Sequence, residues 1–250
     1  MNHEERVQLA NKLTEMMVKK YGDEIVLGGI YGSTAKNTDT EYSDLEMFFI
    51  VKNGSKAKSF SFPYKGIPVG VLVEKVADVE RDIKEIDIKW PLKMGMLFNM
   101  KITCGDRTIL EKFRKMLESV PQEKFDRFIA KQTALCYEEL GRLKAVKIRK
   151  NTYDTGLFVM EVLQEFNVLV AILNREFINY DYFGGLFEAF KFKKLPKDYE
   201  KNARKLLNWT SLSLDEIISL AQVFVHNFVE FASENGIKIV EHVPLEEVEL

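Results

Sequence analysis

Two carboxylates stand one residue apart at Asp44 and Glu46, where an apolar run begins that continues to Ile50. On a β-strand, residues two apart project from the same face, so both carboxylates are expected side by side on one rigid element. Adjacent carboxylates raise each other's pKa unless a cation lies near them. Magnesium is a hard cation that prefers carboxylate oxygens. The pair therefore predicts a divalent-metal site in which both residues are catalytic ligands.

A glycine–serine turn precedes this pair, with Asp44 following Ser33 by eleven residues. Gly32 allows the backbone to approach a phosphate closely, and Ser33 adds a hydroxyl donor beside its own N–H. Lys36 offers a positive charge to a phosphate oxygen. An ordinary turn and a solvated strand face are the plainer interpretations of each feature alone. Together the turn and the pair favour phosphoryl or nucleotidyl transfer, in which a metal bridges phosphate oxygens.

The composition is that of a soluble globular protein, with 250 residues, 46% hydrophobic and 30% charged. A net charge of −2 argues against a nucleic-acid partner, since such partners usually require a basic excess. Cys104 and Cys136 match no metal-ligand spacing. The polar start of the chain shows no signal-peptide pattern, and no apolar run reaches the ~18 residues that span a bilayer. We therefore expect a cytoplasmic protein without a membrane partner.

The first half of the chain alternates between short strand and helix patterns. Expected helices cover residues 4–20 and 78–85, and expected strands cover residues 24–31, 45–51, 69–73 and 96–103. Asn53-Gly54 is a strong turn signal after the strand that carries the two carboxylates. These strands are the elements that must position the metal pair and the phosphate turn.

The second half reads as helical. A capping pattern at Ser119 and Gln122 is expected to start a helix that runs to about residue 147. A loop at residues 151–154, a buried helix over 157–173, a break at 182–185 and a last helix from Ser213 to near Gly236 follow. The sequence thus predicts an α+β protein with two domains, residues 1–118 and 119–250.

The Gly32-Ser33 turn and the Asp44–Glu46 pair resemble the motif of the DNA-polymerase-beta-like nucleotidyltransferases, which runs Gly-Ser, a gap, then Asp-hydrophobic-Asp/Glu. Within that superfamily the chain is more closely similar to the kanamycin (aminoglycoside 4′) nucleotidyltransferase family. The similarity is carried by residues 31–33, 38–39, 42–47, 90–92 and 124–125, together with Gly95. It extends over most of the chain and thins beyond about residue 150.

The resemblance implies a mixed-sheet nucleotidyltransferase domain followed by a helical bundle. It also implies Mg²⁺ as cofactor, ATP or another nucleoside triphosphate as donor, and a small hydroxylated acceptor. An aminoglycoside, and hence antibiotic resistance, comes first among acceptors by resemblance only. In the family the active site lies between two subunits of a homodimer, so a homodimer is implied here as well.

The resemblance implies a glutamate of the helical domain as general base, with the family's nearby lysine touching phosphate. Aligning Gly141 with the family's glycine makes Glu138 the base and Arg142 the phosphate contact. Positions 138 and 142 share one face of a helix, which supports that pairing. An alignment without gaps selects Glu139 instead, so both glutamates stay open.

Two carboxylates that the family associates with its cationic drug are absent, because Gly70 and Ser61 stand at the matching positions. Glu74 would replace one of them only if the strand register differed. Since a polycationic drug needs an acidic pocket, this departure leaves the donor chemistry intact and weakens the drug assignment. The alternatives are a nucleotidyltransferase acting on protein or RNA, and a non-catalytic descendant that binds nucleotide or a partner.

Overall fold

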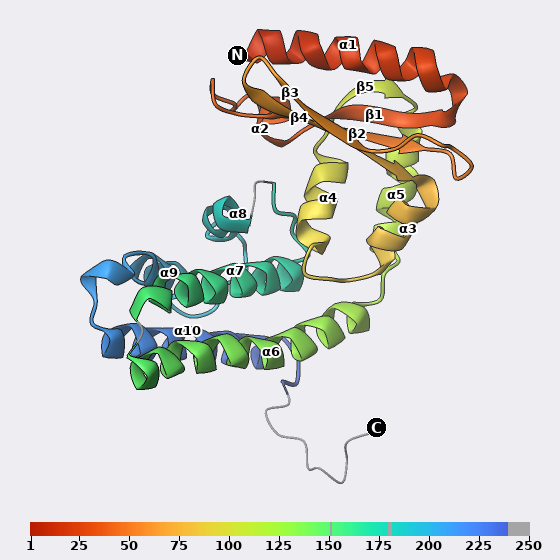
Figure 1. Cartoon of the computed structure of the whole chain (residues 1–250). Helices are drawn as coiled ribbons and strands as arrows, with labels where there is room; N and C mark the ends of the chain where they lie inside the picture. The colour runs from red at the N-terminus through yellow and green to blue at the C-terminus, as the bar shows by residue number, and fades with distance from the viewer. Residues whose placement is uncertain (151, 180–181, 240–250) are drawn as a thin grey trace. The chain divides into compact units, whose positions relative to one another are not determined.

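The computed structural model describes residues 1–150, 152–179 and 182–239 (Figure 1). The side chains of Cys136, Tyr182 and Phe183 are outside that description, and so is the expected loop residue Asn151. The chain divides into two compact units: residues 1–86 with 92–120, and residues 87–91 with those from Pro121 onward. We call them the sheet unit and the helical unit. That they are separate domains divided at residue 118 stays a prediction.

The sheet unit contains a five-stranded sheet in the order β3-β4-β2-β1-β5. Its elements are α1 (His3–Tyr21), η1 (Gly22–Glu24), β1 (Ile25–Tyr31), α2 (Gly32–Lys36), β2 (Leu45–Val51), β3 (Phe60–Tyr64), β4 (Ile67–Lys75), α3 (Val76–Lys84), α4 (Trp90–Phe98, from Leu92 onward in this unit), β5 (Lys101–Gly105) and α5 (Thr108–Glu118). Only the β2–β4 pair is parallel among the described strand pairs. The sheet is therefore mixed, and with the helical second half it confirms the predicted α+β class.

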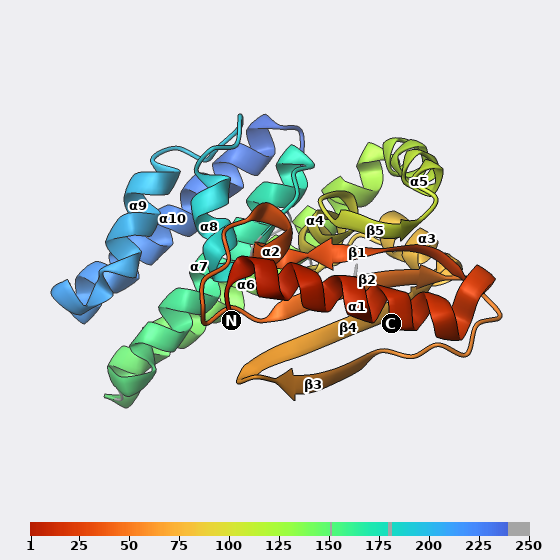
Figure 2. The same cartoon turned by 90° about the horizontal axis from the view of Figure 1, so that it is seen from above.

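Helix α1 covers one face of this sheet, as Figure 2 shows from above. A capping box at Asn2 begins the helix, and Gly22 ends it with a φ of +47°. Its apolar stripe packs on Leu45, Met47 and Phe49 of β2, all fully buried. Because side chains alternate along a strand, Glu46 faces away from α1. One side of β2 thus packs on α1, and the other side carries Glu46 near the start of the strand, followed by the buried Phe48 and Ile50.

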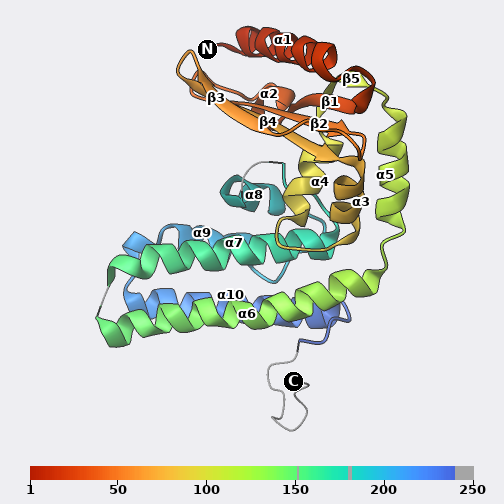
Figure 3. The same cartoon turned by 45° about the vertical axis from the view of Figure 1, so that its right-hand side comes forward.

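The helical unit is built around one buried helix. Its elements are α6 (Gln122–Arg149), η2 (Thr152–Asp154), α7 (Thr155–Asn174), α8 (Tyr182–Ala189), α9 (Tyr199–Leu207), η3 (Trp209–Ser211) and α10 (Leu214–Glu234). Helix α7 packs against α6, α8, α9 and α10 (Figure 3). Its side chains from Phe166 to Leu173 are all buried, which confirms the expected central helix.

Residues Thr152–Asn174 are also long and apolar enough to cross a membrane by composition alone. Within the described part of the chain this is the one such stretch, and 61% of its apolar window is buried inside the protein. A core helix of a soluble protein has this property, because its apolar surface is covered by neighbouring helices.

The strand predicted over residues 96–103 is wrong in its first half. Residues Met96–Phe98 belong to helix α4, and the strand β5 begins only at Lys101. Met94, Leu97 and Met100 are each less than 9% exposed. A short apolar run buried on all sides does not distinguish a helix from a strand, and here the helix forms.

Three further local predictions need correction. Ser119 does not cap α6: it follows α5, where its hydroxyl donates to the Met116 carbonyl, and the N-cap of α6 is Pro121. The expected break at residues 182–185 is instead the start of helix α8. Strand β3 was not predicted, although Lys65 and Gly66 form its hairpin turn to β4 with φ values of +48° and +83°. The capping box at Ser213 is confirmed.

Candidate active site

The turn after β1 lies directly against the acidic strand. Gly32 has a φ of +69°, and a β-carbon at this position would collide with Oε2 of Glu46. Tyr31 and Glu46 are paired across β1 and β2. Only a glycine combines this φ with so close an approach of the backbone to a carboxylate. The structure therefore brings together two features that are well separated in the sequence.

The acidic pair straddles the beginning of β2. Asp44 is exposed and directly precedes the strand, while Glu46 is half-buried within it. Burial and the nearby Asp44 charge raise the pKa of Glu46. The Tyr31 hydroxyl, which donates to Glu46, and the charge of Lys36 act in the opposite direction. The charges of Asp44 and Lys36 thus act in opposite directions on the pKa of Glu46.

These residues fit a magnesium ion in the way that nucleotide-dependent enzymes use it. Within the described residues, no group of three or more His, Cys, Asp or Glu side chains forms a complete metal cage. Magnesium does not require one, since it is commonly bound by one or two carboxylates plus waters and substrate phosphates. A cation beside Asp44 would also offset the repulsion that raises the pKa of Glu46.

The sheet places Gly70 and Ser61, the two positions at which the resemblance implied carboxylates, in one row with Glu46. Glu46 pairs with Gly70 of β4, and Gly70 pairs with Ser61 of β3. A β-carbon on Gly70 would meet no atom within 4 Å. The row running from Glu46 across the sheet therefore carries no further carboxylate and has open space at its centre.

Glu74 does not belong to this row. It pairs with Ile50, four residues further along the strands than Gly70, which corresponds to about 13 Å at the usual strand rise. Burial and the charge of Asp82 raise the pKa of Glu74, and Lys93 opposes that shift. This environment at the far end of β4 argues against Glu74 as a replacement for a carboxylate at position 70.

In the helical unit, Arg142 joins the two candidate bases. Its Nη2 donates to Oε1 of Glu138 at 2.7 Å, and its Nη1 donates to Oε1 of Glu139 at 2.7 Å. Glu161 of α7 lies 3.9 Å from the same guanidinium. The side chain of Glu138 is 61% exposed, whereas that of Glu139 is only 10% exposed. The expected pair Glu138 and Arg142 is thus extended by a second, buried glutamate.

Glu139 has the electrostatics of a group that can exchange a proton near neutral pH. Burial, the neighbouring Glu161 carboxyl and the charge of Glu165 raise the pKa of Glu139 to about 7, although Arg142 acts to lower it. An ideal general base has a pKa close to the working pH. As general base, Glu139 is favoured by its raised pKa, and Glu138 is favoured by the exposure of its carboxylate.

Sequence reasoning missed two participants around the acidic pair. Tyr31 donates a hydrogen bond to Glu46, which follows from strand pairing and not from any local motif. Arg6 is fully buried at the edge of the α1 stripe, three residues before Leu9. A charged residue at core spacing on an amphipathic helix was the signal that could have revealed it.

Two curated relatives define the class of this protein. Both are aminoglycoside nucleotidyltransferases (4′), one from Bacillus sp and one from Staphylococcus aureus. Each is 24% identical over 241 residues, covering 94% of this chain and 93% of the relative. The chain is therefore an enzyme of the nucleotidyltransferase type.

The family model described as the KNTase C-terminal domain matches residues 107–238, more than half of the chain. The protein belongs to this family, which confirms the recognised resemblance. Among solved structures, a nucleotidyltransferase-like protein from Exiguobacterium sibiricum 255-15 is similar at 13% identity. That likeness covers 90% of this chain and 75% of the other, with a TM-score of 0.49.

Proposed function

We propose that the protein transfers a nucleoside monophosphate, AMP from ATP, to a hydroxyl group of a small molecule in a magnesium-dependent reaction. The observation that carries this proposal is the contact of Gly32 with the Glu46 carboxylate. It joins a backbone suited to phosphate with an acidic pair suited to a divalent cation, within one face of the sheet.

Each residue has a defined part in this proposal. Asp44 and Glu46 hold Mg²⁺, which when bound draws charge off the phosphate oxygens of the nucleotide. Gly32 and Ser33 offer backbone and hydroxyl donors to the triphosphate, and Lys36 adds a positive charge. The Tyr31 hydroxyl keeps the Glu46 carboxylate oriented by donating to it.

The transfer itself is a displacement at the α-phosphorus. A glutamate takes the proton from the acceptor hydroxyl, and the acceptor oxygen forms a bond to that phosphorus. The bond to the bridging oxygen breaks and pyrophosphate leaves. We assign the base to Glu138 because its exposed carboxylate can reach a hydroxyl, with Arg142 holding it at 2.7 Å and contacting phosphate. Glu139 is the alternative base.

The acceptor is proposed as a small hydroxylated molecule. The names of the two relatives point to aminoglycosides for those proteins. In this chain the row from Glu46 through Gly70 to Ser61 lacks the carboxylates that would attract ammonium groups. We therefore propose an acceptor with fewer positive charges than kanamycin. We also propose a homodimer, by resemblance to the family, and the cytoplasmic location that the sequence predicts.

Neither alternative from the sequence is favoured by the comparisons. A non-catalytic descendant is disfavoured because the relatives matched over 94% of the chain are named as enzymes. A protein- or RNA-modifying enzyme has no support in the names of those relatives, and the net charge of −2 argues against RNA.

A pyrophosphate-release screen tests the proposal directly. Purified protein is incubated with Mg²⁺ and each of the four nucleoside triphosphates, against sugars, nucleosides and aminoglycosides as acceptors. We expect release with ATP and a neutral or weakly cationic acceptor, and a kcat/KM for kanamycin below about 10⁴ M⁻¹s⁻¹, the low end of ordinary enzymes. Efficient kanamycin adenylation would overturn the acceptor assignment, and no release with any acceptor would overturn the reaction.

A further inference from the structure

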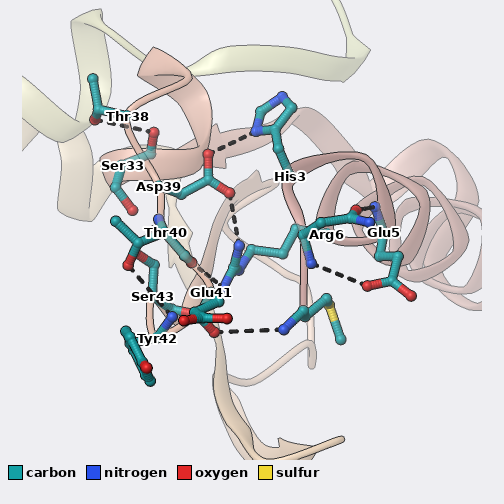
Figure 4. A network of polar contacts seen from close by, with 12 residues as sticks. His3, Glu5, Arg6, Ser33, Thr38, Asp39, Thr40, Glu41, Tyr42 and Ser43 are labelled. Atoms are coloured by element: carbon teal, nitrogen blue, oxygen red, sulfur yellow. Dashed lines mark hydrogen bonds and ion pairs between the residues drawn. The ribbon is translucent and has the colours of Figure 1, made fainter.

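The beginning of α1 holds the loop that connects the Gly32-Ser33 turn to Asp44 (Figure 4). The side chains of Arg6 and Asp39 are 0% and 1% exposed. Nη1 of Arg6 donates to Oδ2 of Asp39 at 2.9 Å, and Nδ1 of His3 lies 2.7 Å from Oδ1. Burial alone would raise the pKa of Asp39, but the hydrogen bonds from His3 and Arg6 hold it below its usual value.

The remaining donors of Arg6 bind carbonyl groups of the same loop. Nη2 donates to the Thr40 carbonyl at 2.5 Å and to the Ser43 carbonyl at 2.7 Å, and Nε donates to the Ser43 carbonyl at 3.0 Å (Figure 4). One guanidinium thus contacts three loop residues through a rigid fork of donors. Ser43 is the residue before Asp44, so this contact fixes the backbone at the entrance to the acidic pair.

The other end of the loop is fastened to the phosphate turn. The Ser33 carbonyl accepts hydrogen bonds from the Thr38 backbone N–H at 3.0 Å and from the Thr38 hydroxyl at 3.4 Å. Between the two ends, the Thr40 N–H donates to the Ser43 hydroxyl oxygen at 2.9 Å. The loop is therefore held at Ser33 on one side and by Arg6 on the other.

We propose that Arg6 is a positioning residue for the metal site: by holding Asp39, Thr40 and Ser43, it sets the place of Asp44 relative to the phosphate turn. This inference rests on the proposed function. A buried ion pair is weak evidence for stability, because an apolar pair of similar volume is often at least as stabilising. The geometric precision that the fork of Arg6 gives to the backbone before Asp44 accounts for a charge at this buried position.

The test compares Arg6→Lys, which keeps the charge and removes the fork, with Arg81→Lys as control. Arg81 is a half-exposed arginine of the same unit, paired with Asp78. Two quantities are measured: amide hydrogen exchange over residues 38–46, and the Kd of Mn²⁺ in the presence of an ATP analogue with a non-hydrolysable α–β bridge. In Arg6→Lys we expect exchange about 10-fold faster and a Kd about 10-fold higher, as for other residues that orient metal ligands. Arg81→Lys should change neither.

Asp39→Asn provides a second variant in case Arg6→Lys does not fold. It preserves the volume of the side chain and removes the charge that both His3 and Arg6 contact. We expect the same two changes, smaller in size, with circular dichroism like that of the unaltered protein. If a folded variant binds Mn²⁺ with a Kd within twofold of the Kd of the unaltered protein, Arg6 is a purely structural residue and the inference is overturned.

Asp44→Asn separates this inference from the proposed function. Metal binding that persists unchanged in Asp44→Asn would overturn the proposed metal site and the connection of Arg6 to it. Faster exchange in Arg6→Lys would still show that Arg6 orders the loop. Loss of metal binding in Asp44→Asn with an unchanged Kd in Arg6→Lys would instead retain the site and reject the role of Arg6.

Discussion

The two units each carry a pair of neighbouring glutamate or aspartate side chains, one exposed and one half-buried or buried. In the sheet unit, Glu46 lies against the backbone of Gly32 and the hydroxyl of Tyr31, and the charge of Asp44 acts on it. In the helical unit, Glu138 and Glu139 are both bound at 2.7 Å by the guanidinium of Arg142. Under the proposed function the first pair receives a cation from solution, whereas the second is already paired with a guanidinium of its own chain. The groups that surround similar acids thus differ, and the proposed function assigns metal binding to the first pair and proton transfer to the second.

The largest effect is expected from Asp44→Asn, which removes one charge from the pair in the sheet unit. If Asp44 is a metal ligand, pyrophosphate release should fall by about 10³-fold or more, since a metal contributes several kcal/mol to such a transition state. Steady-state rates at saturating Mg²⁺ measure this. Asp23→Asn, at an exposed position of the same unit, is the matched control and should keep full activity. Equal rates in both variants would remove the distinction between the two acidic pairs.

The second-largest effect is expected to distinguish Glu138 from Glu139 in the helical unit. Glu138→Gln should lower kcat by about 10²-fold or more, the usual contribution of a general base, while metal binding stays unchanged. Glu139→Gln should retain most of the activity, because its buried carboxylate serves to hold Arg142. Single-turnover rates with bound nucleotide compare the two variants. The reverse order of effects would assign the base to Glu139.

Gly32→Ala tests the contact that defines the pair in the sheet unit. The new β-carbon would meet the Glu46 carboxylate at a φ of +69°, so we expect a loss of about 2 kcal/mol or more in the free energy of unfolding. Urea unfolding followed by circular dichroism measures the loss. Gly54→Ala is the matched control, because a β-carbon there meets no atom within 4 Å. A similar small loss in both variants would contradict the close contact.

The smallest effect concerns the pH dependence of stability in the helical unit. The pKa of Glu139 is raised from 4.5 to about 7, so the folded protein binds a proton there that the unfolded chain releases. The stabilisation from this proton is fully present below pH 4.5 and is lost as the pH rises through 7. Urea midpoints between pH 5 and pH 8 should therefore decline less in Glu139→Gln than in the unaltered protein. Parallel curves would show that Glu139 titrates normally.

The sequence predicted those parts of the sheet unit that depend on local pattern. Strand β2 has the predicted bounds, because its apolar run rich in Phe and Ile is clear in the chain itself. The contact between Gly32 and Glu46 could not be predicted in detail, because spacing suggests proximity but gives neither the φ of Gly32 nor the direction in which Glu46 points. The elements that surround the acidic pair could not be predicted from local pattern, because they are brought together by the tertiary structure.

Long-range contacts account for what the sequence did not reveal. Arg6 binds a loop more than thirty residues away, and Tyr31 reaches Glu46 only through the register of two strands. Helix α4 was mistaken for a strand in part because an apolar run buried on all sides has no distinguishing period. In the helical unit, the position of Glu161 beside Glu139 depends on how α7 packs on α6.

The open space at Gly70 has a consequence for how this enzyme can change. A side chain introduced there would enter unoccupied volume, in the same row as Glu46, without displacing a neighbour. Under the proposed function, the acceptor surface can therefore be altered at this position while the residues proposed to bind the nucleotide are left untouched. The chain keeps one position that is costly to mutate, Gly32, which directly follows Tyr31, the strand partner of Glu46, and one that is nearly neutral, Gly70. Such an arrangement lets new acceptors be explored by substitution under a fixed reaction.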